Sequence, residues 1–382
     1  MKKKIIKIIA ILLVFEALYL FVVFTNMPFI AKWRTIYIET AMSTMTKRWM
    51  ATAFFPKKII DAVMSNVDNT EGYDTNLATI KRENAPRISS IKNKNTFYKV
   101  FNEIDPKSLE AFLAANPTLL ANGYEKLYLN TLDKKYKGNI KINNIFGSEI
   151  CLLDAYNGIL VSKVSGDGFA GQLMTIKDPA QIKVGLSSKF GNSGEYLKDI
   201  IDFNSAIAGI NGSGFYDPNG KGNGGTAFGL IISEGKKVNP PLGKKNKIIG
   251  FDKEDNFFVG NYKNTDFMRD VVEFRPALIV NGKKVVAGSS GWGIQPRSCL
   301  AQRADGAVLM LIIDGRQIGY SIGATVGDCA DILEKYGAIN AANLDGGTSA
   351  VMVYNGKELT KPSNGNPPGR FLPNGFIIMP RK

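Results

Sequence analysis

The fold of this chain is decided by three consecutive segments, AVLMLIIDGR (residues 307–316), TVGDCADILEKYG (325–337) and AINAANLDGGTSAVMVY (338–354). The first segment and the start of the third are apolar runs of strand length, as expected of buried strands. Between them, Thr325 and Asp328 have the spacing of a capping box, and Gly337 stands where a helix would end. Strand, helix and strand in this order predict a βαβ crossover, in which the two strands are parallel.

Each predicted strand ends at an aspartate followed by glycine, Asp314-Gly315 in one case and Asp345-Gly346 in the other. Parallel strands have their carboxyl ends at one edge of a sheet, so we expect the two carboxylates side by side, or one strand apart, within roughly 5–10 Å of each other. Asn211 ends another predicted strand and is expected at the same edge. Either Asp-Gly pair alone is equally consistent with a β-turn, but the two together favour a functional site.

Short strand-like runs separated by glycine turns begin near residue 145, and a helix with Ser193 as its N-cap is expected before the strand that ends at Asn211. These patterns predict an α+β or mixed α/β fold, with a central mixed sheet and the βαβ crossover near the carboxyl terminus. We place this domain at residues 145–382. Residues 32–144 show no pattern that indicates chemistry, and we interpret them as a juxtamembrane stalk or accessory region.

The amino terminus has the features of a transmembrane helix. A basic tail at residues 1–7 precedes an apolar run at 8–31, which is interrupted mainly by Glu16 and can cross a hydrocarbon core of about 30 Å. A cleaved signal peptide is the alternative, but its apolar core would be shorter, and the nearest small-residue site, at 51–53, lies well beyond the run. We therefore expect an uncleaved signal anchor in the cell membrane, with the amino terminus in the cytoplasm and the body outside the cell.

The composition limits the partners and cofactors that we expect for this chain. Lys and Arg number 48 against 34 Asp and Glu, a net charge of +14, without the interleaved aromatic residues of a nucleic-acid surface. We therefore expect no nucleic acid partner, and a basic surface that faces anionic lipid or an anionic polymer. The chain has no histidine, and Cys151, Cys299 and Cys329 lack C-x-x-C spacing, so we expect neither a metal nor another cofactor. The cysteines are expected to be buried thiols, with one disulfide as the alternative.

Two further stretches match known ligand-binding motifs only in part. Residues 166–171, GDGFAG, match the glycine pattern of dinucleotide sites, but strands rather than a helix are expected to follow, so we predict no nucleotide site. The loop that starts at Asp217 begins like a calcium loop, yet Phe228 stands where the bidentate glutamate belongs. A turn or a flexible lid is expected there instead, with Asp217 able to reach a ligand.

The carboxyl-terminal half resembles the phosphodiester glycosidase family. The motifs that carry the resemblance occur in family order at Ile210-Asn211-Gly212 with Gly214-Phe215-Tyr216-Asp217, at Arg297-Ser298, at Ile313-Asp314-Gly315-Arg316, at Asn343-Leu344-Asp345-Gly346-Gly347-Thr348-Ser349, and at Pro362-Ser363 with Gly369-Arg370. The resemblance covers residues from about 145 to 380. Thr348 occupies a position where glycine is usual, a change that would narrow a pocket.

This resemblance implies hydrolysis of a sugar-1-phosphodiester, which releases the sugar from a phosphate ester. A phosphate monoester leaves readily at neutral pH, so the reaction needs little help from a general acid, and the absence of histidine is compatible with it. The residues implied at the site are the catalytic carboxylates Asp345 and Asp314 and the substrate-binding residues Asn211, Asp217, Arg297, Arg370, Gly346, Gly347, Thr348 and Ser349. The arginines are expected to hold phosphate, whereas Asn211 and Ser349 bind hydroxyls or order water.

On a membrane-anchored protein that faces outward, the expected substrate is a glycan-phosphate polymer of the cell envelope or of an exopolysaccharide. The alternative is a non-catalytic envelope protein that binds glycan phosphate in the same cleft. Release of reducing sugar from a sugar-1-phosphodiester distinguishes the two hypotheses.

Overall fold

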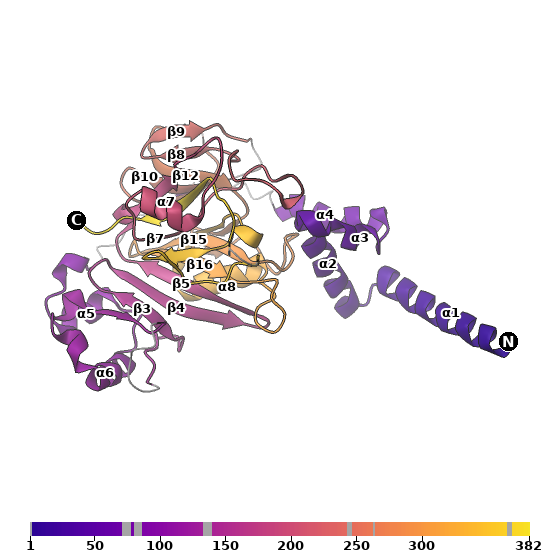
Figure 1. The fold of residues 1–382 in the computed structure, drawn as a ribbon, viewed down its shortest axis with the longest axis horizontal. Coiled ribbons are helices and arrows are strands. Elements are labelled where there is room, and N and C mark those ends of the chain that lie inside the picture. Colours follow the sequence, from indigo (N-terminus) through magenta and orange to yellow (C-terminus); the bar gives the residue numbers. More distant parts are fainter. Residues whose placement is uncertain are drawn as a thin grey trace.

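The computed structural model describes residues 2–70, 78–79, 86–132, 140–242, 247–262, 264–364 and 369–382. Within these residues the strands form three sheets, of nine, six and five strands, in one body from which a long amino-terminal helix projects (Figure 1). The predicted fold class, a mixture of helix and sheet that follows an apolar amino-terminal helix, is confirmed.

The nine-stranded sheet carries the predicted crossover. Its strands are β2 (Tyr128–Asn130), β3 (Ile150–Asp154), β4 (Ile159–Gly166), β5 (Phe169–Ile176), β13 (Ala277–Val280), β14 (Lys283–Lys284), β15 (Arg297–Arg303), β16 (Val308–Ile313) and β17 (Ala338–Asn343). Strand β15 lies between β16 and β17 and pairs antiparallel with both, so β16 and β17 run parallel with one strand between them. Helix α8 (Val326–Lys335) connects them and begins with the predicted capping box of Thr325 and Asp328.

The continuous apolar run of β16 is explained by burial on both faces of the sheet. Val308, Met310 and Ile312 belong to the core that the three sheets share. The alternate residues Leu309 and Leu311 belong to a second core, which the inner face of α8 covers. Strand β16 is therefore fixed in position from both sides, and its carboxyl end lies at the same edge of the sheet as that of β17.

The five-stranded sheet places Asn211 beside this edge. Its strands are β6 (Ile182–Leu186), β7 (Ala208–Asn211), β18 (Met352–Tyr354), β19 (Lys357–Glu358) and β20 (Asn374–Ile378). Helix α7 (Leu197–Phe203) precedes β7 and buries Leu197, Ile200 and Ile201, as its spacing predicts. The predicted N-cap is wrong: Tyr196 rather than Ser193 occupies that position, and it makes no side-chain cap bond.

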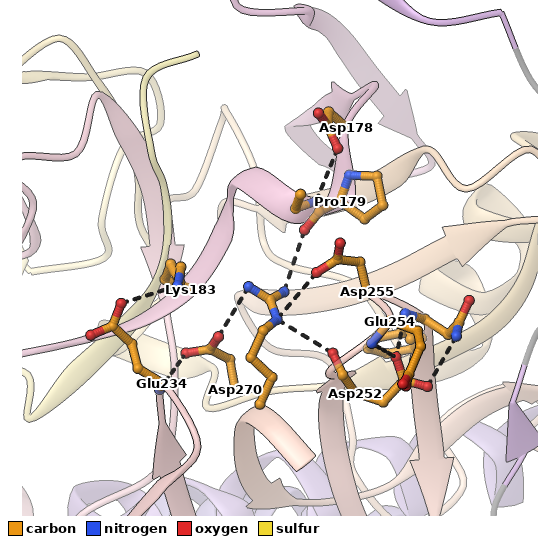
Figure 2. A network of polar contacts seen from close by, with 12 residues as sticks. Asp178, Pro179, Lys183, Glu234, Asp252, Glu254, Asp255 and Asp270 are labelled. Atoms are coloured by element: carbon orange, nitrogen blue, oxygen red, sulfur yellow. Dashed lines mark hydrogen bonds and ion pairs between the residues drawn. The ribbon is translucent and has the colours of Figure 1, made fainter. Parts of the chain in front are cut away.

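The six-stranded sheet is joined to the five-stranded sheet by an arginine network (Figure 2). Its strands are β1 (Ala78–Thr79), β8 (Ile231–Ser233), β9 (Lys236–Asn239), β10 (Lys247–Asp252), β11 (Phe257–Gly260) and β12 (Met268–Phe274). The guanidinium of Arg269 lies 3.2 Å from Asp270 and 3.3 Å from Asp255, and Asp270 also accepts a hydrogen bond from the backbone of Val184 in β6. Asp270 therefore links β12 of the six-stranded sheet to β6 of the five-stranded sheet.

The amino-terminal region consists of helices α1 (Lys2–Phe24), α2 (Pro28–Ser43), α3 (Arg48–Thr52) and α4 (Lys57–Thr70). Among the described residues, α1 alone is long and apolar enough to cross a membrane. It ends at Phe24, before the predicted end of the apolar run, because Pro28 begins a separate helix. The guanidinium of Arg34 donates hydrogen bonds to the carbonyls of Val22, Val23 and Thr25, which the end of α1 leaves unpaired.

The rest of the predicted accessory region packs on the edge of the nine-stranded sheet. Helices α5 (Lys94–Val100) and α6 (Pro106–Ala115) share a hydrophobic core with residues of β3 and β4. Residues 71–77, 80–85 and 133–139 of this region lie outside the described residues. The GDGFAG stretch spans the turn between β4 and β5, so a strand rather than a helix follows it, as predicted.

Candidate functional site

A cavity of about 380 Å³ lies where the start of β15 and the end of β17 meet the surrounding loops and the amino-terminal region. This volume falls in the range of small-molecule sites, roughly 300–1,000 Å³. The cavity lining contains most of the residues predicted from sequence: Asp217, Arg297, Asp345, Gly346, Gly347, Thr348, Ser349 and Arg370. The two predicted residues that do not line it are Asn211 and Asp314.

Asp345 follows β17 directly, and its backbone is held by a buried amide. The Asn211 side chain donates from Nδ2 to the Asp345 carbonyl at 2.6 Å and accepts at Oδ1 from the Val351 N–H at 3.3 Å. Asn211 is fully buried and lies behind the loop that follows β17. We therefore interpret Asn211 as a positioning residue for Asp345 rather than as the substrate-binding residue that the sequence predicts.

The two glycines after Asp345 are required by the local backbone. A Cβ atom at Gly346 would lie 2.6 Å from the Pro296 carbonyl oxygen, which is closer than any side chain tolerates. Gly347 has a φ of +63°, in the left-handed region that favours glycine, and its N–H donates to Pro296 at 2.9 Å. The loop therefore packs directly on the start of β15, which keeps the Asp345 carboxylate at the cavity.

The Asp345 carboxyl group is largely desolvated and lies at the cavity. Burial raises its pKa to about 6, although a hydrogen bond from Ser349 and the positive charges of Arg370 and Arg316 act in the opposite direction. A carboxylate with a pKa near neutrality can hold or release a proton under physiological conditions, which suits acid/base work.

Arg370 is oriented by an ion pair inside the site. Its Nη1 lies 2.7 Å from Asp217 Oδ2 and 3.3 Å from Thr348 Oγ1, and its guanidinium stacks 4.4 Å from the centre of the Phe215 ring. Burial alone would raise the pKa of Asp217, but hydrogen bonds from Arg370 and the Gly222 N–H outweigh it and lower that pKa. Asp217 therefore stays ionised and fixes Arg370 at the cavity.

The other two arginines of the cavity are held by neutral groups. Arg297 is buried, and its guanidinium donates to the backbone carbonyls of Ala324, Trp292 and Gly293 at 3.0, 2.9 and 2.6 Å. Arg316 donates from Nη2 to Gln295 Oε1 at 2.6 Å, and no carboxylate of the described residues forms an ion pair with it.

The positive charges of the cavity arginines repel one another. Burial lowers the pKa of Arg316, and the charges of Arg297 and Arg370 lower it further, whereas the charge of Asp345 acts in the opposite direction. A bound anion would relieve this repulsion, so the cavity has the charges expected of an anion site, with a carboxylate beside them.

Comparison with known proteins finds a family match over the region that carries the cavity. Residues 204–379, which include every cavity residue named above, match the family model described as NAGPA, phosphodiester glycosidase. This region belongs to the phosphodiester glycosidase family. It also contains the motifs that suggested the resemblance, from Asn211 to Arg370.

Individual relatives are more distant. Over 92 residues the chain is 37% identical to the SPbeta prophage-derived uncharacterized protein YomE of Bacillus subtilis (strain 168), which amounts to 23% of this chain and only 14% of that protein. Solved structures similar to the chain include the zebrafish N-acetylglucosamine-1-phosphodiester alpha-N-acetylglucosaminidase catalytic domain auto-inhibited by its pro-peptide, with 21% identity and a TM-score of 0.48 over 58% of this chain and 82% of that one. A putative exported protein from Burkholderia pseudomallei K96243 has 14% identity and a TM-score of 0.45, over 85% of this chain and 89% of that one.

In the phosphodiester glycosidase domain, Asp314 ends β16 as predicted but is buried away from the cavity lining. Its carboxylate accepts hydrogen bonds from the Tyr320 hydroxyl at 2.8 Å and from the Lys361 N–H at 2.9 Å. Burial raises its pKa despite these bonds. Asp314 thus ties two loops together beneath the site, and its catalytic role stays a prediction.

Two parts of the site were not singled out from the sequence. Arg316 belongs to a quoted motif, and the signal that could have identified it is its place directly after Asp314-Gly315 at the strand end. The second part is residues 43–46, which line the cavity from the amino-terminal region. No sequence signal pointed to them, because they lie about 250 positions from the β15 loop that they contact.

Neither a metal-binding cluster nor a disulfide occurs in the described residues. No cluster of three or more Asp, Glu or Cys side chains there is arranged to hold a metal ion. The three cysteines are free and buried, which agrees with their interpretation as thiols.

Proposed function

We propose that this chain is a membrane-anchored hydrolase that cleaves the bond between a sugar C1 atom and a phosphodiester oxygen in a glycan of the cell envelope or an exopolysaccharide. The observation that carries the proposal is the position of Asp345, a carboxylate with a pKa of about 6, in a cavity lined by Arg297, Arg316 and Arg370. The family match supports this class of bond, and the cavity offers groups for each part of it.

The proposed reaction divides the work between the carboxylate and the arginines. Water forms a bond to C1 while the C1–oxygen bond breaks, and the electron pair of that bond leaves with the phosphate monoester. Asp345, ionised, accepts the proton of the attacking water or stabilises the positive charge that develops at C1. The leaving phosphate gains one negative charge, which the arginines stabilise.

Among the arginines, Arg316 is the strongest candidate for direct phosphate contact. Arg370 is already paired with Asp217, and three hydrogen-bonding contacts to carbonyls occupy Arg297. Arg316 is held only by neutral acceptors, so its charge is available to an anion. Thr348 and Ser349 offer hydroxyls at the same wall for the sugar.

The proposed membrane anchor rests on the way α1 is joined to the rest of the chain. The hydrogen bonds of Arg34 to the end of α1, and that of the Tyr19 hydroxyl to the Phe54 carbonyl at 2.8 Å, tie α1 to α2 and the end of α3. A signal peptide that is removed would not need these contacts. They support an uncleaved helix, with the domain outside the cell.

The test is hydrolysis of a panel of sugar-1-phosphodiesters by the purified full chain in lipid nanodiscs. The panel includes UDP-N-acetylglucosamine and methyl-phosphate esters of several sugars, and the readout is reducing sugar. Sugar release that Asp345→Asn abolishes supports the proposal. Binding of panel members without any release would instead support the alternative, a non-catalytic protein that binds glycan phosphate in the same cavity.

A further inference from the structure

We propose that residues 27–58, which we call the collar, lie on the membrane surface and close one side of the cavity, so that the substrate is a sugar-1-phosphodiester attached to a lipid of the same membrane. The collar comprises α2, α3 and the start of α4. This inference rests on the proposed hydrolase function and on the proposed anchor, and it adds the physical form of the substrate.

The collar is bound firmly to the catalytic domain by the last turns of α2. Gln295 Nε2 donates to the Thr40 carbonyl at 2.9 Å and to Thr44 Oγ1 at 2.8 Å, and Thr40 Oγ1 accepts from the Ile294 N–H at 2.9 Å. A Cβ atom at Gly293 would lie 2.5 Å from the Thr40 backbone nitrogen, so this close approach requires a glycine. The interface between the collar and the catalytic domain is therefore a packed part of the fold.

The same turns of the collar form a wall of the cavity. Ser43, Thr44, Met45 and Thr46 line it together with Asp345 and the arginines. Thr44 Oγ1 also lies 3.4 Å from Arg316 Nη2, the guanidinium to which we assign phosphate contact. A substrate in the cavity therefore lies against the collar.

The other end of the collar is fixed to the proposed membrane helix. The Tyr19–Phe54 hydrogen bond holds the turn after α3 against the last turns of α1. Helix α1 is the segment proposed to cross the membrane (Figure 1). The 16 residues of α2 connect α1 to the cavity wall. Since a helix of that length measures about 24 Å, the cavity lies close to the end of the membrane helix.

The exposed side chains of the collar suit an anionic lipid surface. Large apolar residues are exposed, and their exposed fractions are 54% for Met27, 74% for Phe29, 49% for Trp33, 58% for Trp49 and 51% for Phe54. The exposed charged residues of the collar are all basic: Lys32, Lys47, Arg48, Lys57 and Lys58. Its single acidic residue, Glu39, is buried and accepts a hydrogen bond from the Gly291 N–H.

Aromatic residues concentrate at the membrane–water interface, and basic side chains near a bilayer are attracted to anionic headgroups. The collar carries both kinds of residue next to a helix that enters the membrane. Its partner is therefore the bilayer surface itself, and the cavity wall is continuous with the surface that contacts it.

The first test measures the position of the collar with the full chain in nanodiscs that contain phosphatidylglycerol. The three tryptophans are Trp33, Trp49 and Trp292, and Trp292 lines the cavity instead of the exposed collar surface. Lipids that carry a spin label near the headgroup should quench the wild-type fluorescence. The Trp33→Phe/Trp49→Phe variant, which retains Trp292, should lose most of the quenching. Equal fractional quenching of both proteins would overturn the placement of the collar.

The second test compares two esters of the same sugar-1-phosphate, one with a dialkylglycerol inserted in the nanodisc and one with methanol in solution. Because a shared membrane raises the effective concentration of the substrate, the lipid ester should have a kcat/KM at least about tenfold higher. Trp49→Ser/Phe54→Ser should reduce hydrolysis of the lipid ester only, with the melting temperature unchanged. Equal rates on both esters would overturn the inference while supporting the hydrolase, whereas hydrolysis of neither ester would contradict the hydrolase itself.

Discussion

Replacement of Asp345 by asparagine should separate the chemical role of this residue from its effect on stability. The substitution keeps the shape of the side chain and its ability to accept the Ser349 hydrogen bond, but it removes the negative charge. If Asp345 acts on the attacking water or on C1, turnover should fall by about 10²–10⁴-fold, the range for a positioned acid/base group.

The same substitution should stabilise the protein at neutral pH. The pKa of Asp345 is raised from 3.8 to about 6, so the folded state resists its ionisation. A difference of roughly two pKa units corresponds to about 3 kcal/mol, which the folded wild type loses as the pH rises from near 4 to above 6. The neutral asparagine does not incur this loss. The variant should therefore be more stable by up to about 3 kcal/mol at pH 8 and equally stable at pH 4.

The assay is thermal melting of the full chain in nanodiscs at pH 4 and pH 8, on the preparation used for turnover. Asp217→Asn is the matched control. The pKa of Asp217 is lowered by its contacts with Arg370 and Gly222, so its ionised form contributes stability above the ordinary carboxyl pKa, and its loss should destabilise at pH 8. A fully active Asp345→Asn, or a shift in melting temperature that is the same at both pH values, would refute the reasoning.

Three further results are expected from the same geometry. First, kcat/KM of the wild type should reach a plateau above about pH 6 and fall about tenfold per pH unit below it, because the reaction needs the ionised form of Asp345; a profile that is flat down to pH 4 would contradict this. Second, Arg316→Ala should weaken inhibition by inorganic phosphate and raise KM, and Arg316→Lys should not restore either, because an ammonium does not reproduce the planar contact with Gln295; unchanged phosphate inhibition would assign anion binding to Arg370 or Arg297 instead. Third, Asn211→Ala should lower kcat more than it raises KM, since it frees the backbone of Asp345 without removing a group from the cavity lining; a pure KM effect would restore the predicted substrate contact.

The parts of the fold that depend on local chemistry follow from the sequence. The capping box of Thr325 and Asp328, the apolar run of β16 and the positions of Asp314 and Asp345 at strand ends are local patterns, and the structure contains each of them. The order of strands within a sheet depends on pairing between distant segments. For that reason the sequence predicts two parallel strands at one edge but does not show that β15 lies between them.

The candidate site divides in the same way. The residues that follow β17 are predictable, because one motif contains Asp345, Gly346, Gly347 and Ser349. The burial of Asp314 depends on Tyr320 and Lys361, which come from separate loops and close over it only in the folded chain. Residues 43–46 line the cavity through contacts between distant parts of the chain, and no local pattern at a polar helix end predicts such contacts.

The most direct test of the proposed hydrolysis through Asp345 is release of reducing sugar from the sugar-1-phosphodiester panel by wild type and Asp345→Asn, with both proteins as full chains in nanodiscs. We predict that the wild type hydrolyses at least one member of the panel and that Asp345→Asn, folded and at least as thermally stable at pH 8, loses about 10²–10⁴-fold in turnover. Equal release by the two proteins, or no release from any member by the wild type, would contradict this prediction.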